Sequence, residues 1–185
     1  YGLPVVANLP RRTMEQAVQA ASQLGFPGVV KLLSTTVTHK SDVGGVQVGI
    51  ASVDEAYAAW DRIMAGARAA HPDAAITGVL VQAMVQGGRE LIVGMSRDPS
   101  VGALLMFGLG GTLVEVLGDV VFRLSPIHRL EARDMLAGIR GVRLLGAVRG
   151  APPADLAALE DVLLRVSQLA TDFPEISEID LNPLL

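Results

Sequence analysis

Apolar positions recur at two different spacings along this chain, and each spacing predicts a different kind of element. A helical spacing begins at the capping pair Thr13 and Gln16 and continues to residue 24. A second helix follows the capping pair Ser52 and Glu55 and ends at His71, which precedes a proline and is typical of a helix-end cap. These two helices are predicted for the first part of the chain.

Short apolar runs bounded by glycine, proline or aspartate predict the strands. They cover residues 29–33, 46–50, 76–84, 90–97, 103–107, 112–116, 120–124 and 176–181. Because short turns join the consecutive runs after residue 76, we expect those strands to form an antiparallel sheet. A short helix over residues 131–136 and a long helix over residues 153–170 complete the pattern.

The order of these elements predicts an α+β fold in two lobes. Helices and strands are interleaved in the first part of the chain, whereas a run of strands is followed by two helices and a strand in the second. We expect a small lobe over residues 1–84 and a large lobe over residues 85–185. A chain of 185 residues is long enough to bury a core in such lobes.

The composition excludes several classes of protein. Half of the residues are hydrophobic and 18% are charged, so the chain is not disordered. The net charge of −4, without a basic run, argues against nucleic acid as a partner. The absence of cysteine excludes a disulfide framework and a thiolate nucleophile, and it fits the cytoplasm, where we expect the protein to work. No uncharged run is long enough to span a membrane, and the ends of the sequence suggest a module of a longer protein.

Lys31 stands inside the apolar run 28–33 and is the first candidate for a functional side chain. An unpaired ammonium group is costly to bury, so Lys31 points to solvent, pairs with a carboxylate or meets an anion in a cleft. Downstream, His39 is followed within a few residues by Gly44 and Gly45. Glycines let backbone N–H groups approach phosphate oxygens, and a neutral imidazole can attack phosphorus. This segment is therefore either a phosphate site or an ordinary solvated loop.

The last predicted strand alternates polar and apolar residues, which places Glu178, Asp180 and Asn182 on one face. Their oxygen atoms are ligands of the kind that Mg²⁺ accepts, although the same alternation is typical of the solvent-facing side of a half-buried strand. The glycine-rich string 108–111 precedes a predicted strand instead of a helix, so we interpret it as a turn. His128 is expected to be a surface residue.

Five strings with a particular order and spacing cover nearly the whole chain. They are residues 27–31, 39–46, 88–94 with 97–99, 105–111 with 114–116, and 178–184. Together they resemble the ATP-grasp domain of NDP-forming acyl-CoA synthetases, which is related to the β-subunit of succinyl-CoA synthetase. The resemblance implies an ATP-grasp fold, with two α+β lobes that hold a nucleotide in the cleft between them. It also implies a reversible reaction in which acyl-CoA, ADP and phosphate give a free acid, CoA and ATP through a phosphohistidine.

The same resemblance implies roles for individual residues. His39 would carry the phosphoryl group, and Glu115, Asp180 and Asn182 would be the ligands of Mg²⁺. The residues expected to bind ATP or ADP are Val29, Lys31, Gly44, Gly45, Val81, Gln82, Ala83, Met84 and Glu90. A CoA-binding α-type domain or subunit would be the partner, and acyl-CoA and a carboxylic acid would be substrates of the full protein. Neither nucleic acid nor a membrane is expected as a partner.

Two alternative functions belong to other classes. A similar ATP-grasp domain is fused to an acetyltransferase domain in some bacterial protein lysine acetyltransferases, where it has a regulatory role. The presence of His39 favours the synthetase over this ligand sensor. The second alternative is a structural or interaction domain that carries the five strings by coincidence.

Overall fold

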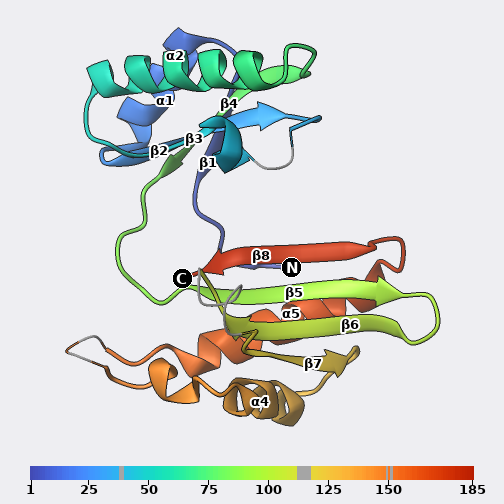
Figure 1. Cartoon of the computed structure of the whole chain (residues 1–185). Helices are drawn as coiled ribbons and strands as arrows, with labels where there is room; N and C mark the ends of the chain where they lie inside the picture. The colour runs from blue at the N-terminus through green and yellow to red at the C-terminus, as the bar shows by residue number, and fades with distance from the viewer. Residues whose placement is uncertain (38–39, 112–117, 149, 151) are drawn as a thin grey trace. The chain divides into compact units, whose positions relative to one another are not determined.

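The computed structural model describes residues 1–37, 40–111, 118–148, 150 and 152–185, which form two compact units (Figure 1). The small unit is Pro4–Gln86, and the large unit consists of Tyr1–Leu3 together with Gly87–Leu185. The sequence placed the first three residues in the small lobe. They instead pack on the large unit, where Tyr1 donates a hydrogen bond to Asp172 and its ring meets Phe173 edge-on. This hydrogen bond raises the pKa of Tyr1 to about 12.

The small unit is a four-stranded antiparallel sheet with two helices on one face. Its elements are β1 (Asn8–Arg11), α1 (Met14–Leu24), β2 (Gly28–Ser34), the 3₁₀ turn η1 (Lys40–Val43), β3 (Val46–Ile50), α2 (Val53–Ala70) and β4 (Ile76–Ala83). The strands lie in the order β1-β4-β2-β3. Both helices pack on the sheet and against each other, as Figure 1 shows. Among the described residues of this unit, α1 and α2 cover one face of the sheet, and the opposite face is called the helix-free face below.

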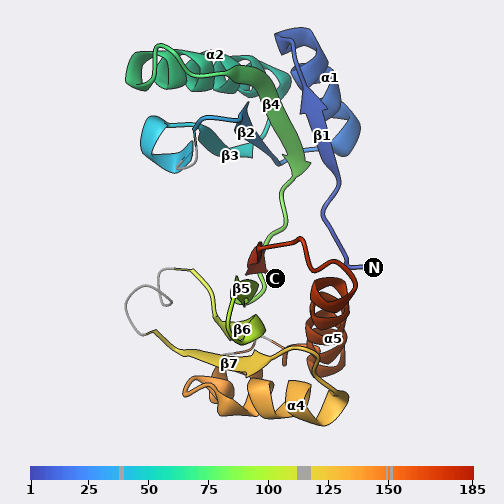
Figure 2. The same ribbon diagram turned by 90° about the vertical axis from the view of Figure 1, so that its right-hand side faces the viewer.

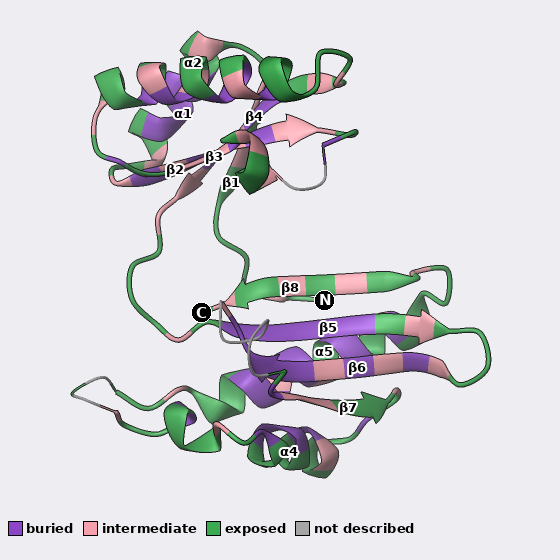
Figure 3. Cartoon of the chain, in the orientation of Figure 1, coloured by how far each residue is buried: buried purple, intermediate pink, exposed green. Residues whose placement is uncertain are grey.

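Alternation along the strands decides which residues of the small unit are buried. Val30 and Leu32 of β2, together with Val79 and Val81 of β4, are almost completely buried under the helices. Figure 3 shows buried residues on the sides of α1 and α2 that face the sheet. Alanines line the facing sides of the helices, and their small side chains let α1 and α2 approach the sheet closely.

The large unit repeats the plan of one sheet and two helices. Its elements are β5 (Leu91–Asp98), β6 (Gly102–Leu109), β7 (Val120–Leu124), α4 (Arg129–Gly138), the 3₁₀ turn η2 (Val142–Leu145), α5 (Leu156–Asp172) and β8 (Glu178–Leu184). The sheet is antiparallel in the order β7-β6-β5-β8. Helices α4 and α5 pack on one face of it, as the rotated view in Figure 2 shows. Met95, Leu105 and Phe107 fill the centre of this second core.

Most of the predicted elements are confirmed, and the exceptions have local causes. The sequence analysis missed β1, because its Asn-Leu-Pro-Arg string offers a single large apolar residue and a proline, which is tolerated here because β1 lies at the sheet edge. Helix α5 begins later than predicted because Asp155 caps it, accepting from the Ala158 N–H at 2.9 Å. The predicted strand 112–116 falls outside the described residues. Among the helices that the structure describes, none is long and apolar enough to cross a membrane.

His128 has a structural role that the sequence analysis did not assign. Its Nδ1 accepts a hydrogen bond from the Glu131 N–H, and the Glu131 carboxylate accepts one from the His128 N–H at 3.0 Å. This reciprocal capping box starts α4 two residues before its predicted beginning.

Candidate functional site

Lys31 lies on the helix-free face of the small sheet. Its neighbours Val30 and Leu32 point into the core, so strand alternation turns Lys31 to the other side, where it is partly buried. In register it stands between Leu80 of β4 and Val46 of β3. An ammonium group therefore stands in the middle of an apolar strip, and burial of this group lowers the pKa of Lys31.

The rest of that face has a composition suited to a planar ring next to an anion. Strand register places on it Asn8, Pro10, Val29, Lys31, Leu33, Val46, Val48, Leu80 and Gln82. Val48 remains 66% exposed, and Val29 and Leu80 are partly exposed, so apolar surface is available for stacking. Gln82 donates a hydrogen bond through its amide nitrogen to the side-chain oxygen of Asn8.

The four predicted residues at the end of β4 do not share one role. The side chain of Val81 is buried under the helices and faces away from the helix-free side. Gln82 faces the helix-free side, and Ala83 pairs with Gly28. The Met84 N–H donates to the Pro27 carbonyl at 3.1 Å. A ligand on this face can therefore contact the Gln82 side chain but not the side chain of Val81.

Gly44 and Gly45 shape the turn between η1 and β3. Gly44 has a φ of +66°, a conformation that favours glycine, and its N–H donates to the Ser41 carbonyl at 3.1 Å. The Gly45 N–H donates to the Lys40 carbonyl at 2.7 Å, and a β-carbon at Gly45 would lie 2.7 Å from that oxygen. Both amides are thus used inside the turn. In this conformation, contacts to phosphate fall to the neighbouring side chains.

In the large unit, the structure brings Glu90 against the glycine-rich turn that follows β6. The Glu90 carbonyl accepts a hydrogen bond from the Gly110 N–H at 2.6 Å. A β-carbon at Gly110 would lie 2.7 Å from the Glu90 carbonyl carbon, and one at Gly111 would overlap the Glu90 carboxylate. The prediction of a turn over 108–111 is wrong for its first half, because Gly108 and Leu109 still pair within β6. Gly110 and Gly111 pack closely on Glu90 and support its exposed carboxylate, which the sequence analysis did not predict.

Arg89 joins the same region to the segment before α5. Its guanidinium donates to the carbonyl of Gly146 at 2.5 Å and to that of Pro152 at 2.8 Å. These two bonds tie the carbonyls of Gly146 and Pro152 to Arg89, next to the start of β5.

The predicted metal-binding residues of β8 are exposed. Glu178 and Asp180 stand next to Ser96 and Gly94 of β5, and the pairing with β5 shifts register after Leu181, at Asn182. In the part of the chain that the structure describes, no three acidic or histidine side chains gather closely enough to hold a metal ion by themselves. Exposed oxygen atoms without a closed cage fit Mg²⁺, which keeps waters and binds through one or two protein groups and substrate phosphates.

Two of the predicted site residues, His39 and Glu115, fall outside the described residues. A cavity of about 370 Å³ lies between α4, η2 and α5 and is lined mainly by apolar residues such as Leu136, Leu145 and Leu156. None of the predicted site residues lines this cavity. Each unit therefore carries candidate residues of its own. In the small unit they lie on the helix-free face of the sheet, and in the large unit they lie around Glu90 and along β8.

Comparison with known protein families identifies the chain as an ATP-grasp domain, because that family matches residues 1–185. The β-subunit of ADP-forming acetate–CoA ligase I from Pyrococcus furiosus is 44% identical over 184 residues, which are 100% of this chain and 79% of the subunit. ADP-forming acetate–CoA ligase I from Archaeoglobus fulgidus is 47% identical, but this chain spans only 27% of its length.

Solved structures give the same result. Acetyl-coenzyme A synthetase 1 of Ca. Korarchaeum cryptofilum, in complex with coenzyme A and Ca-AMPCP, superimposes with a TM-score of 0.96 at 40% identity, covering 100% of this chain and 80% of that one. Another structure of that protein holds coenzyme A and Mg-AMPPCP, and its phosphohistidine segment points towards the nucleotide-binding site. It superimposes with a TM-score of 0.84 at 38% identity, covering 100% of this chain and 79% of that one.

These relatives are ligases and synthetases, so the regulatory acetyltransferase alternative is not favoured. The predicted α+β ATP-grasp fold is confirmed. The matches extend over the whole chain, and the five strings of the sequence lie within them. The chain belongs to the ATP-grasp family, and over its whole length it is similar to the ATP-grasp parts of ADP-forming acyl-CoA ligases.

Proposed function

We propose that this chain binds ADP or ATP with Mg²⁺ and transfers a phosphoryl group within an ADP-forming acyl-CoA ligase. The full reaction would convert acyl-CoA, ADP and phosphate into a carboxylic acid, CoA and ATP. The observation that carries the proposal is Lys31, a partly buried cation on an apolar sheet face. Among the described residues, no carboxylate lies within ion-pair distance of it. A phosphate group is the anion that this family would supply.

The fit of the helix-free face to a nucleotide supports the proposal. Val29 and Leu80 offer apolar surface to a purine ring, and Lys31 lies two residues from Val29 along β2. Two residues of a strand span roughly 6 to 7 Å, which separates a base from the first phosphates. Gln82 adds an amide on the same face, next to Val29.

Residues of the large unit would bind Mg²⁺. Asp180 and Asn182 would hold it, with Glu115 as a third ligand that lies outside the described residues. When bound, Mg²⁺ would neutralise phosphate charge. Because Asn182 is neutral, we expect this affinity to depend on the nucleotide.

Phosphoryl transfer requires mainly positioning and charge neutralisation, and Lys31 would supply part of both. His39 would be the acceptor: a ring nitrogen forms a bond to the terminal phosphorus of ATP, the bond to the bridging oxygen breaks, and the electron pair leaves with ADP. The proton on the other ring nitrogen passes to solvent. In the direction of ATP synthesis, the same bonds form and break in reverse.

The partner in this proposal is a CoA-binding α-type domain or subunit, which would bind acyl-CoA and form the phosphoryl donor. The β-subunit designation of the Pyrococcus furiosus relative supports a division of this kind. Cleavage of the thioester would belong to that partner.

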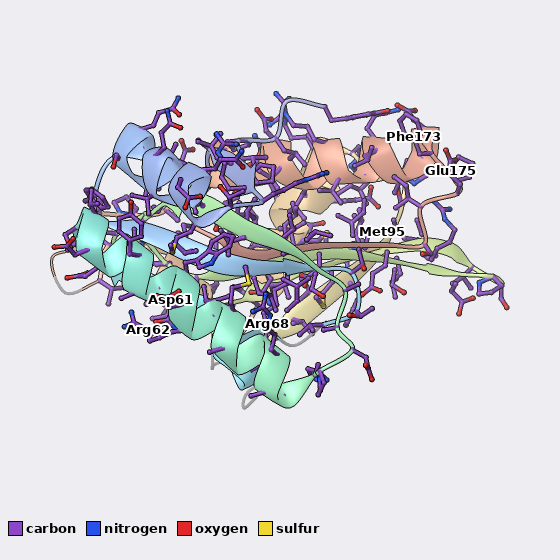
Figure 4. All side chains as sticks on the ribbon, turned by 90° about the horizontal axis from the view of Figure 1, so that it is seen from above. Asp61, Arg62, Arg68, Met95, Phe173 and Glu175 are labelled. Atoms are coloured by element: carbon purple, nitrogen blue, oxygen red, sulfur yellow. The ribbon has the colours of Figure 1, made fainter. Side chains whose placement is uncertain are left out.

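Nucleotide binding is tested first. Thermal unfolding of the chain with millimolar ADP and Mg²⁺ should show stabilisation, which reaches about 2.7 kcal/mol when the ligand is at 100 times its dissociation constant. Lys31→Met should abolish the shift. Arg68→Met is the matched control, because Arg68 is an exposed cation on α2 of the same unit (Figure 4). A folded wild-type chain that ADP does not stabilise would contradict the proposal.

The role of His39 is tested on the full-length protein with its partner. Incubation with labelled ATP should give a phosphoramidate that is stable to alkali and labile to acid, and His39→Asn should lack it. If the His39→Asn protein makes ATP from acyl-CoA, ADP and phosphate at the normal rate, His39 is an ordinary loop residue.

A further inference from the structure

The chain uses lysine at only two positions, Lys31 and Lys40, whereas its other 13 basic residues are arginines. Lys31 lies on β2 and Lys40 begins the η1 turn of the same unit. The sequence analysis assigned a role only to the first of them. Since the two lie nine positions apart along the chain, their relation depends on how the intervening segment folds.

Two consecutive backbone hydrogen bonds bring Lys40 back to β2. The Lys40 carbonyl accepts from the Gly45 N–H at 2.7 Å, and the Gly45 carbonyl accepts from the Leu32 N–H at 2.7 Å. Lys40 is thereby anchored next to the residue that follows Lys31. Like Lys31, it is partly buried instead of extending freely into solvent.

The positive charge of Lys40 acts on Lys31. Burial is the main cause that lowers the pKa of Lys31, and the positive charge of Lys40 lowers it further. Among the described residues, neither lysine forms an ion pair, although Asp42 belongs to the same turn. Two adjacent cations without a counter-charge are unfavourable unless an anion binds to both of them.

The chemistry of lysine indicates which anion this is. An ammonium group is a compact charge with three rotatable donors and is a common ligand of phosphate oxygens, although arginine also binds phosphate, through two parallel contacts. A polyphosphate presents several oxygens on neighbouring phosphorus atoms and can contact two ammonium groups simultaneously. Because the Gly44 and Gly45 amides are used within the turn, side-chain donors are the ones that remain there.

We propose that Lys40 is a second phosphate-binding residue, which together with Lys31 holds the polyphosphate tail and gives the chain its preference for nucleotides with two or more phosphates. This inference rests on the proposed function, since it assumes that a nucleotide occupies the helix-free face. Lys31 would bind any nucleotide monophosphate. Lys40 would add a contact only where a further phosphate is present.

The test compares ADP with AMP by calorimetry on the wild-type chain and on Lys40→Met. The wild-type chain should bind ADP more tightly than AMP, and Lys40→Met should reduce this ratio about tenfold, the value of one charge-assisted hydrogen bond. Lys40→Arg should retain part of the ratio because it keeps the charge. Arg68→Met should leave the ratio unchanged. An unchanged ratio in Lys40→Met would overturn the inference while leaving the proposed function intact.

A second measurement uses the fact that the chain has only two lysines. Reductive ¹³C-methylation labels the two side chains and the chain's amino terminus, so each lysine signal can be assigned with the Lys40→Arg variant. Addition of ADP should shift both lysine signals, and AMP should shift mainly that of Lys31. A Lys40 signal that does not move on saturation with ADP overturns the inference. Absence of any nucleotide binding to the folded wild-type chain would overturn the proposed function as well.

Discussion

A β-carbon at Gly66 would lie 2.5 Å from the carbonyl oxygen of Val43. Gly66 is inside α2, where glycine is otherwise unfavourable, and Val43 closes the η1 turn that carries Lys40. The absence of a side chain at this position therefore lets the turn pack directly on the helix. The position of η1, and therefore that of Lys40, depends on the absence of a side chain at Gly66.

Gly66→Ala should destabilise the chain. Helix propensity alone would favour alanine by about 1 kcal/mol, but the clash with backbone should reverse the sign and cost about 1 to 3 kcal/mol. Urea unfolding measures the difference. Because η1 must move, the affinity for ADP should fall together with stability. A variant more stable than the wild type would show that the turn adjusts without cost.

Asp119 is predicted to be a strong local determinant of the large unit. Its side chain is nearly buried, and the two carboxylate oxygens accept from the backbone N–H groups of Arg140 and Gly141, both at 2.7 Å. Asp119→Ala leaves both donors without this partner and should cost about 1 to 3 kcal/mol for each. Asp119→Asn keeps one acceptor oxygen, so its free energy of unfolding should lie between those of Asp119→Ala and the wild type. Equal urea midpoints for Asp119→Ala and the wild type would contradict this role.

Lys31 should make stability depend on pH in the alkaline range. Its pKa in the folded chain lies below the ordinary 10.5, because burial and then Lys40 disfavour the charged form. Between the two pKa values the unfolded chain binds more protons, so the free energy of unfolding should rise with pH. Below the folded-state pKa, the charged lysine costs stability. Lys31→Met should therefore unfold at a higher temperature than the wild type at neutral pH.

The measurement is thermal unfolding of wild type and Lys31→Met from neutral pH to above 10.5, with Arg68→Met as the control. The difference between wild type and Lys31→Met should shrink as pH rises, whereas the control should follow the wild type. The stabilised variant should also lose its response to ADP, since the same charge that costs stability is proposed to bind phosphate. A less stable Lys31→Met at neutral pH would contradict the prediction.

A charge network between α4 and α5 should give a second, acidic pH dependence. Glu160, whose side chain is only 10% exposed, accepts from Arg133 at 3.0 Å and from Arg129 at 3.1 Å. The hydrogen bond from Arg133, followed by that from Arg129, holds the pKa of Glu160 below its ordinary 4.5. This contribution is present above 4.5 and is lost as pH falls through the lower folded-state pKa.

Arg133→Ala should therefore lower the unfolding temperature at neutral pH, and the difference from wild type should shrink when Glu160 is protonated. Arg143→Ala removes an exposed arginine of η2 and should leave the profile unchanged. Differential scanning calorimetry over the acidic range provides the comparison. If the unfolding temperatures of Arg133→Ala and the wild type differ by the same amount across that pH range, the lost stability comes from packing and not from charge.

Local patterns in the sequence predicted the elements and several orientations. The alternation along the last strand was sufficient to predict that Glu178, Asp180 and Asn182 are exposed, which the structure confirms. For Lys31 the sequence left its surroundings open. The caps at Thr13 and Ser52 likewise fixed the starts of α1 and α2. Such features depend on residues within one or two turns of each other, so periodicity is enough to identify them.

Long-range contacts decided the rest. The bonds that join Lys40 to Gly45 and Gly45 to Leu32 bring the two lysines together, and the packing of Gly110 on Glu90 turns a plain loop into the support of a carboxylate. Neither relation leaves a helical or alternating pattern in the sequence. Each depends on sheet register and on backbone atoms that meet only after residues far apart in the chain have packed, and for that reason only the tertiary structure could determine them.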